Sequence, residues 1–319
     1  MSDGEGPSTI GITGATGFVG RYLVPWLAEQ GFLARPVSAR SDLGSLRRAL
    51  AGVEVLVHLA GRAHVLRDRA VDAAGVYHST NAELTRQVLE AAAAAGVRGF
   101  VFASSVKAVG ERSGSPWSES VAPHPAGPYG RSKLEAERIV AARGAQLGLR
   151  TVILRFPLIY GPGMRANMLR LFRAIDRGVP LPLGRVRNQR SLLYVGNAAA
   201  AIEAALRHPE AGSDIYFVSD GRDLSTPELI RAIGAALGRP ARLLAVPAGW
   251  LRLGGRAGDQ LARFLPWPYT SATVERLLGS LQVDITRIRE RLGYSPPFTL
   301  EDGLRATAEW YRSSGGGLA

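Results

Sequence analysis

The sequence predicts an α/β fold in which a doubly wound parallel sheet is joined to a smaller α/β domain. Two observations support this prediction. Apolar, strand-like runs alternate with helical segments over the first half of the 319 residues, an order typical of parallel strands covered by helices on both faces. In addition, a glycine-rich turn links the first of these strands to the first helix.

The glycine-rich turn lies in residues 9–20, whose sequence is TIGITGATGFVG, and a helix is predicted after it over Phe18–Glu29. Gly14 permits the tight turn, Gly17 lets the backbone approach a pyrophosphate, and Gly20 lets the helix pack closely on the strand. Free N–H groups and the positive end of the helix dipole then favour phosphates. The stretch therefore predicts a Rossmann-type dinucleotide site.

A second strand is predicted over Leu33–Ala39, and Arg40 closes it. At this strand end an acidic residue binds the ribose of NAD, whereas an arginine accommodates the 2′-phosphate of NADP. Arg40 therefore favours NADP, while Asp42 keeps NAD open. In the structural alternative, Arg40 is a solvated strand end and Asp42 caps a helix over Leu43–Ala51.

A buried strand is predicted over Val53–Leu59, ending in Ala60 and Gly61, small residues that suit a close approach to a cofactor. We interpret His58 within this strand as a core histidine. The charged stretch that follows, Arg62–Tyr77, is predicted to be a loop.

Beyond that loop, a helix is predicted over Thr80–Ala95, with Asn81 near its start. Gly96 ends the helix, since glycine is favoured just past a helix C-terminus. The next strand is predicted over Gly99–Ala103.

The residues after this strand include Ser105, and the Ser-, Pro- and Gly-rich stretch Glu111–Pro128 reads as a long loop over a site. A helix then opens with Tyr129 and Lys133, which lie on one face because they are four residues apart. An isolated pair of this kind usually marks only an amphipathic face. Here Lys133 is one of two lysines among 39 basic residues, which makes it a candidate for chemistry.

The composition limits other functions. The chain has no cysteine, and its five histidines show no metal-ligand spacing, so no metal site is expected. The formal net charge is +12, but the arginines are spread along the chain, which favours an anionic small substrate over nucleic acid. The first residues are polar and no apolar run is long enough to span a bilayer, so we expect no membrane partner and a cytoplasmic location.

A strand over Thr151–Phe156 completes the first domain, which is predicted to span residues 1–156 with returning segments near 190–220. Residues 157–319 are predicted mainly to form the smaller, substrate-binding domain. The elements predicted after residue 156 are the helices Asn167–Arg177, Asn197–Arg207, Thr226–Leu237 and Val274–Leu278 and the strand Asp214–Ser219.

Together these residues resemble the extended short-chain dehydrogenase/reductase family, and within it the nucleotide-sugar epimerases, dehydratases and reductases. The match covers nearly the whole chain. It rests on residues 13–20 of the glycine turn, His58-Leu59-Ala60, Asn81, Ser105, the Tyr129/Lys133 pair and Tyr160-Gly161-Pro162-Gly163.

The resemblance implies catalytic roles for three residues. Tyr129 would give a proton to the sugar C4 oxygen as hydride arrives, or remove it in the reverse direction. Lys133 would stabilise the phenolate and hold the nicotinamide ribose, and Ser105 would orient the same oxygen.

The resemblance also implies two sets of binding residues. For NAD or NADP these are Gly14, Thr16, Gly17, Phe18, Val19, Arg40, Asp42, Leu59, Ala60, Gly61, Asn81, Lys133, Phe156 and Pro157. For a UDP-sugar they are Asn167, Met168, Leu181 and Arg190, to which we add the second lysine, Lys107.

Residues 104–107, 180–184 and 190–195 look most like those of bacterial enzymes that reduce the 4-keto group of UDP-linked 6-deoxy-N-acetylhexosamines. Val106 and Lys107 stand where dehydratases of the family carry Asp and Glu, which argues against dehydration. The alternatives are a UDP-sugar 4-epimerase that retains NAD and a non-catalytic regulator that senses a dinucleotide. The oligomeric state stays open, with a homodimer as one option.

Overall fold

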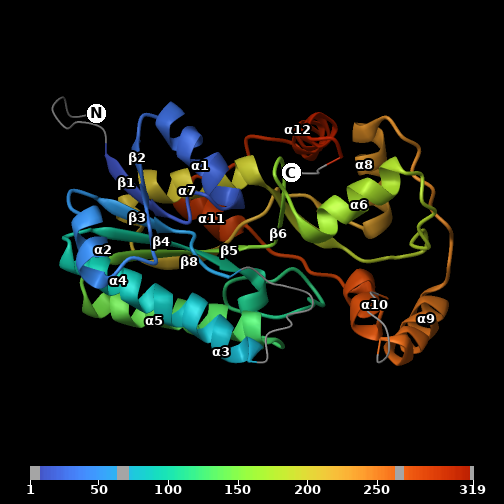
Figure 1. Ribbon diagram of the computed structural model, residues 1–319, viewed down its shortest axis with the longest axis horizontal. Coiled ribbons are helices and arrows are strands. Elements are labelled where there is room, and N and C mark those ends of the chain that lie inside the picture. Colours follow the sequence, from blue (N-terminus) through green and yellow to red (C-terminus); the bar gives the residue numbers. More distant parts are fainter. Residues whose placement is uncertain (1–7, 63–71, 263–268, 317–319) are drawn as a thin grey trace.

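A six-stranded parallel sheet forms the larger part of the molecule in a computed structural model that describes residues 8–62, 72–262 and 269–316 (Figure 1). The strand order is β2-β1-β3-β4-β5-β8. The strands are β1 Thr9–Thr13, β2 Leu33–Val37, β3 Val55–His58, β4 Gly99–Ser105, β5 Arg150–Phe156 and β8 Asp214–Phe217.

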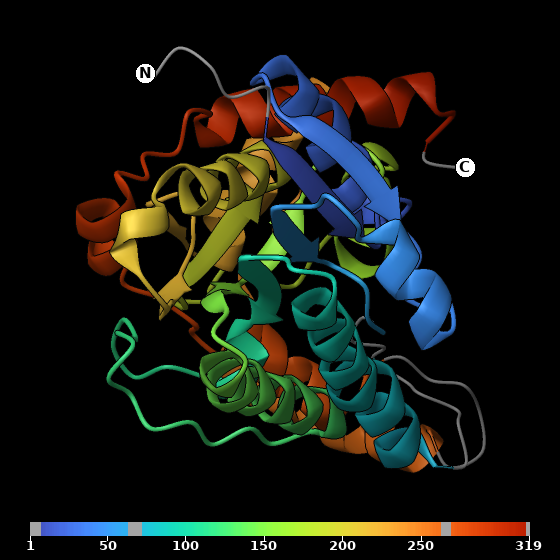
Figure 2. The same cartoon turned by 90° about the vertical axis from the view of Figure 1, so that its left-hand side faces the viewer.

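Helices cover both faces of this sheet (Figures 1 and 2). One layer consists of α1 Phe18–Glu29, α7 Val195–Arg207 and α11 Thr286–Leu292. The other consists of α2 Leu43–Ala49, α4 Leu84–Ala94 and α5 Pro128–Gln146. Each layer buries its apolar side chains against the sheet. The predicted doubly wound, Rossmann-type architecture is therefore confirmed.

The strand order reverses direction between β1 and β3. From β1 the chain passes through α1 to β2 on one side, whereas β3, β4 and β5 follow one another on the other side. In open α/β sheets this reversal opens a crevice at the carboxyl ends of the strands, where ligands bind. The glycine turn after β1 lies at this crevice.

One helix differs from its prediction in a way that matters for the crevice. Instead of beginning at Thr80, it begins with α3 Ala73–Tyr77 and passes through a π-helical turn at His78–Glu83 into α4. A π turn shifts the side chains of one helical turn relative to the next. Asn81 in this turn is only 2% exposed, and its side-chain amide forms hydrogen bonds with neighbouring segments of the chain.

A second, smaller unit contains a three-stranded sheet of order β6-β7-β9. Its strands are β6 Leu158–Tyr160, β7 Arg190–Tyr194 and β9 Asp223–Leu224, and its helices are α6 Ala166–Asp176, α8 Thr226–Leu237, α9 Ala248–Leu261, α10 Ser271–Leu278 and α12 Leu300–Ser313. A separate cluster of buried side chains holds this unit together. The domain boundary predicted after residue 156 stays a prediction.

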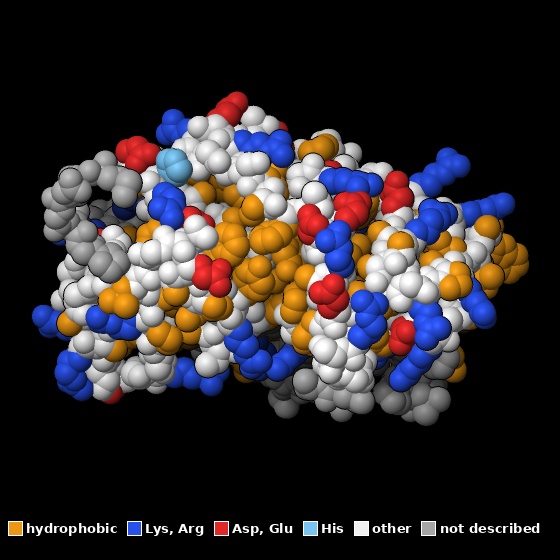
Figure 3. Space-filling view, turned by 90° about the horizontal axis from the view of Figure 1, so that it is seen from above, with side chains coloured by type: hydrophobic (Ala, Val, Ile, Leu, Met, Phe, Trp, Pro, Cys, Tyr) orange, Lys and Arg blue, Asp and Glu red, His pale blue; other side chains and the backbone are white. Residues whose placement is uncertain are grey.

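Aromatic rings join the two units. The Phe298 ring packs edge to face on Trp26 of α1 and Tyr194 of β7, with centroids 6.0 and 5.4 Å apart. Figure 3 looks down on the side that carries α1 and α12, and apolar side chains gather near the middle of this face. Within the described residues, no helix has the length and apolar character needed to cross a membrane.

Candidate active site

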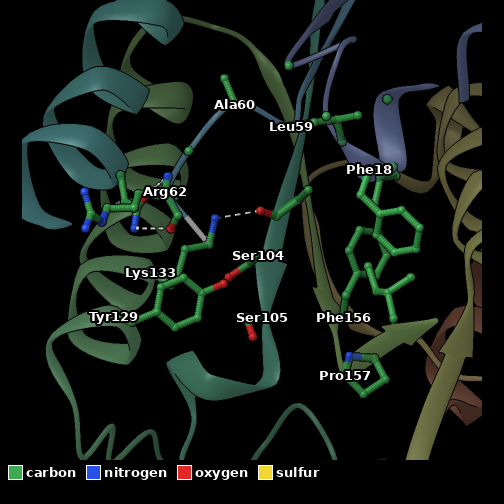
Figure 4. A pocket seen from close by; sticks show the side chains of 18 residues that line it. Phe18, Leu59, Ala60, Arg62, Ser104, Ser105, Tyr129, Lys133, Phe156 and Pro157 are labelled. Carbon is green, nitrogen blue, oxygen red and sulfur yellow. Dashed lines mark hydrogen bonds between the residues drawn. The ribbon is translucent and has the colours of Figure 1, made fainter. Parts of the chain in front are cut away.

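A pocket with a volume of about 350 Å³ opens at the carboxyl ends of the central strands (Figure 4). This volume is within the range of small-molecule sites. Thirteen of the predicted site residues line it: Gly14, Gly17, Phe18, Val19, Leu59, Ala60, Gly61, Asn81, Ser105, Tyr129, Lys133, Phe156 and Pro157.

The glycine turn forms a backbone cradle at one side of the pocket. Gly14 has φ +71°, and a Cβ there would lie 2.8 Å from the backbone nitrogen of Ala60 in the turn after β3. A Cβ on Gly20 would overlap the Gly14 carbonyl oxygen. Gly17 is the N-cap of α1, and no side chain in the described residues caps this helix. The cradle and the uncapped N–H groups fit a dinucleotide pyrophosphate.

Tyr129 and Ser105 meet on the opposite side. Tyr129 is in the first turn of α5, and Ser105 is the last residue of β4. Their side chains hydrogen-bond, but burial outweighs this contact and raises the pKa of Tyr129 to about 12. The ring of Tyr77 packs edge to face on that of Tyr129, with centroids 5.8 Å apart. The phenol therefore keeps its proton at neutral pH.

Lys133 lies one helical turn from Tyr129, and both side chains face the end of β4 (Figure 4). Its Nζ donates to the carbonyl oxygen of Ala103 at 2.7 Å and lies 4.1 Å from the Phe102 ring centroid. Burial lowers the pKa of Lys133 to about 7, and the charge of Glu137 opposes this effect. Phe18, Phe156 and Pro157 form the facing wall.

A buried ion pair lies behind Lys133. The carboxylate of Glu137 accepts from Nη2 of Arg155 at 2.8 Å and from the Ser104 hydroxyl at 2.5 Å. The side chains of Arg155 and Glu137 are only 4% and 2% exposed. Since Tyr129, Lys133 and Glu137 are spaced by four residues, they share one face of α5. This face connects the pocket to the core of the sheet.

Asn81 ties the turn after β3 to α5. Its side-chain oxygen accepts from the backbone N–H of Arg62 at 2.7 Å, and its amide nitrogen donates to the Ser132 hydroxyl at 3.0 Å. A Cβ on Gly61 would lie 2.8 Å from that oxygen, so the turn passes close to Asn81. Asn81 thus fixes the backbone of the pocket wall.

His58 is a core histidine, as the sequence suggested. Its two ring nitrogens contact the hydroxyls of Thr13 at 2.7 Å and Thr85 at 3.1 Å. Complete burial lowers the pKa of His58 to about 3, so the ring is neutral. It holds β1, β3 and α4 together below the pocket.

Three residues predicted for the cofactor lie outside the pocket lining. Arg40 is exposed beyond the end of β2, which ends at Val37 and not at Ala39. Asp42 accepts from the backbone N–H of Ser45 at 2.9 Å and caps α2, so the structural alternative holds for this residue. Thr16 is exposed, and its carbonyl oxygen accepts from Nε of Arg21.

The predicted substrate residues also lie outside this lining. Met168 is buried in the apolar cluster of the smaller unit, whereas Asn167 on the same helix is exposed. Leu181 forms a bridge to Leu243. Arg190 donates from Nη1 to the carbonyl oxygen of Arg276 at 2.7 Å.

Lys107, predicted as a substrate residue, lies outside the pocket lining as well. Its ammonium instead pairs with the carboxylate of Glu111, four residues on. Burial lowers the pKa of Lys107, and the charges of Arg190 and Arg276 lower it further. The four side chains form a group, here called the cationic cluster, with three positive charges and one negative charge. Such a group favours an anion.

Several pocket residues were not predicted as site residues. Gly20, Arg62, Ala103, Ser104 and Ile159 also line the pocket. Ser104 directly precedes the predicted residue Ser105, and Arg62 directly follows Gly61. Their position next to predicted site residues was the only sign of them in the sequence. In the cationic cluster, Glu111 lies in the loop after β4 and Arg276 lies on α10. Because these two residues are far apart in the sequence, no local pattern could have connected them.

Residues 10–219 match the model of the NAD-dependent epimerase/dehydratase family. The chain is 34% identical to a UDP-glucose 4-epimerase of Vibrio cholerae, over 96% of either protein. It is 31% identical to an N-acetyl-α-D-glucosaminyl-diphospho-ditrans,octacis-undecaprenol 4-epimerase of Escherichia coli O157:H7, over 84% of this chain and 81% of that protein.

Among solved structures, the fold is similar to that of MoeE5 in complex with UDP-glucose and NAD. The TM-score is 0.76 at 27% sequence identity, and the similarity covers 96% of this chain and 99% of MoeE5.

Proposed function

The chain belongs to the NAD-dependent epimerase/dehydratase family, and from this membership we propose that it reduces the 4-keto group of a UDP-linked hexose by hydride transfer. The observation that carries the proposal is the meeting of Ser105, Tyr129 and Lys133 in a pocket that also contains the glycine cradle. Reduction of a carbonyl requires a proton donor, which is Tyr129, a hydroxyl that orients the oxygen, which is Ser105, and a cation, which is Lys133.

The protonated state of Tyr129 fits its role as the proton donor of a reduction. A carbonyl that receives hydride must also receive a proton, and a phenol with a pKa near 12 holds its proton at neutral pH. Ser105 hydrogen-bonds Tyr129 and is therefore placed to bond the same substrate oxygen. When bound, the nicotinamide cofactor supplies the hydride.

Lys133 stabilises the phenolate of Tyr129 and offers hydrogen-bond donors to the cofactor. As the phenol gives up its proton, a neighbouring ammonium lowers the energy of the phenolate. The Ala103 carbonyl holds the Lys133 ammonium by one hydrogen bond and leaves two of its three N–H donors for other partners.

The cationic cluster is our proposed site for the diphosphate of the UDP group. Lys107, Arg190 and Arg276 carry three positive charges against one carboxylate, Glu111. The negative charge of a diphosphate would neutralise the excess positive charge of the cluster. The planar guanidinium of Arg190 is suited to donating paired hydrogen bonds to phosphate oxygens. The names of the Vibrio relative and of the MoeE5 complex, which both include a UDP-sugar, support this substrate class.

We propose NAD as the cofactor. Arg40 is the residue that favours NADP in the sequence, but its side chain is exposed and lies outside the pocket lining. The similar MoeE5 contains NAD. The oligomeric state stays open, with a homodimer as one option, and the cytoplasmic location stays a prediction.

A second candidate is a UDP-sugar 4-epimerase that uses the same residues with retained NAD. The names of the two curated relatives favour it, since both are 4-epimerases. Epimerisation begins with oxidation at C4, so Tyr129 would first have to act as a base.

One pair of assays separates these candidates. The protein is supplied with NADH and a UDP-4-keto-6-deoxy-N-acetylhexosamine, and separately with UDP-glucose or UDP-N-acetylglucosamine alone. We expect NADH to be consumed in a 1:1 ratio with the keto sugar. Interconversion of C4 epimers without net NADH consumption would favour the epimerase, and cofactor binding without turnover in either assay would favour the regulator.

A further inference from the structure

Helix α9 carries a row of apolar side chains that are exposed in the described part of the chain. Trp250, Leu253 and Leu261 are 68%, 56% and 44% exposed, and Ala257 between them is exposed as well. At about 100° per residue these four side chains lie within an arc of about 80° on the helix surface. We call them the α9 stripe.

The neighbouring face of α9 already has its partner. Leu251, Gly255 and Gly258 are buried, and a Cβ on Gly255 would lie 3.0–3.1 Å from atoms of Val274 and Ser271 in α10. The stripe is therefore not the face that attaches the helix to the protein. Figure 1 places α9 and α10 at the end of the molecule away from the six-stranded sheet.

Arginines border the stripe. Arg252 and Arg256 on α9 are exposed, and Arg252 also contacts the Glu275 carboxylate at 2.8 Å. Residues 239–263 contain five arginines and one acidic residue, Asp259, but Arg239 pairs with Asp176 and Arg252 with Glu275. The apolar row therefore lies beside a modest excess of positive charge, to which the exposed Arg256 contributes.

We propose that α9 docks on a bilayer surface that contains anionic phospholipids. An exposed tryptophan and leucines beside arginines are typical of helices that lie in the membrane interface, with the apolar side chains below the headgroups and the arginines at the phosphates. A stable protein interface takes roughly 20 residues or more from each side. The stripe supplies four, which fits shallow insertion better than a protein partner. The proposal does not rest on the proposed function, and it replaces the expectation of no membrane partner, which rested on the lack of a run long enough to span a bilayer.

The test uses the full-length protein and sedimentation with vesicles. One set consists of equal parts phosphatidylglycerol and phosphatidylcholine, and the other of phosphatidylcholine alone. We expect binding to the anionic set that weakens as salt is raised, because salt screens the arginines. Leu253→Ser should weaken this binding about fivefold or more, and Arg256→Glu about tenfold or more.

Leu43→Ser is the matched control, since Leu43 is an equally exposed leucine, at 58%, on the distant helix α2. It should bind vesicles like the wild type. The proposal fails if the wild type does not bind anionic vesicles, or if Leu253→Ser and Leu43→Ser bind equally well. It also fails if Leu253→Ser changes the oligomeric state in the absence of vesicles, because a second copy of the chain would then cover the stripe.

Discussion

Glu137 lies one turn of α5 beyond Lys133, and its carboxylate raises the pKa of that lysine against the effect of burial. The carboxylate is itself held by Arg155 and Ser104. The charge of Lys133 in the pocket therefore depends on an ion pair in the core. This relationship gives the first two predictions.

The first prediction is that Glu137→Gln moves the alkaline limb of kcat/KM to lower pH. The protonated fraction of Lys133 falls as pH rises through its pKa, which is about 7. Without the Glu137 charge this pKa falls further, so activity is lost about one unit earlier. Glu135→Gln on the same helix is the control, because Glu135 is half-exposed and pairs only with His78 among the described residues. Superimposable profiles for the two variants would contradict the coupling.

The second prediction concerns stability. Arg155→Ala leaves the buried carboxylate of Glu137 without its cation and should cost about 3–5 kcal/mol of unfolding free energy. Arg222→Ala breaks the pair with Glu301, whose side chains are 61% and 63% exposed, and should cost less than about 1 kcal/mol. Urea unfolding measures both values. Equal losses of unfolding free energy in the two variants would mean that burial does not determine how much the Arg155–Glu137 pair contributes to stability.

The third prediction is that Arg40→Ala leaves the preference between NADH and NADPH within about twofold of the wild type, because Arg40 does not line the pocket. Binding titrations with both cofactors measure this. A selective loss of NADPH affinity would restore Arg40 as the 2′-phosphate ligand and NADP as the cofactor.

The fourth prediction tests the cationic cluster. Arg190→Ala should raise KM for the UDP-sugar by about tenfold to a hundredfold, since charge-assisted hydrogen bonds contribute about 1.5–3 kcal/mol. Its kcat should change little, because the diphosphate is bound equally in ground and transition states. Arg187→Ala, which removes an exposed arginine three residues away, is the control. An unchanged KM in Arg190→Ala would place the diphosphate elsewhere.

The sequence predicted the parts of the fold that depend on local pattern. The helices α1 and α8 span the predicted residues Phe18–Glu29 and Thr226–Leu237. The pocket also follows in part from local pattern, because the glycine turn and Ser105 stand at strand ends that a parallel sheet brings to one edge.

Features set by tertiary packing could not be predicted in this way. The Glu137–Arg155 pair joins α5 to β5 and shows only once both elements are placed. Helix α9 contains four glycines, which disfavour a helix, and packing on α10 stabilises it. The rarity of lysine in the chain made Lys107 a candidate substrate residue, but its pairing with Glu111 shows only in the folded structure.

Helix α12 is a different case, because a local signal for its start is present in the sequence. Thr299 is followed three residues later by the acidic Asp302, and the two side chains form a capping box with each other's backbone N–H groups. The beginning of this helix is therefore predictable without knowledge of tertiary packing.

The central claim is that Tyr129 protonates the substrate oxygen as hydride arrives, and a single-turnover measurement with Tyr129→Phe tests it most directly. The bound NADH is mixed with the UDP-4-keto sugar, and its oxidation is followed in the variant and the wild type. General acid catalysis contributes about 10²–10⁴-fold, so the rate should fall by at least about a hundredfold while NADH affinity stays within about threefold. A rate within about tenfold of the wild type, equivalent to about 1.4 kcal/mol, would contradict the assignment.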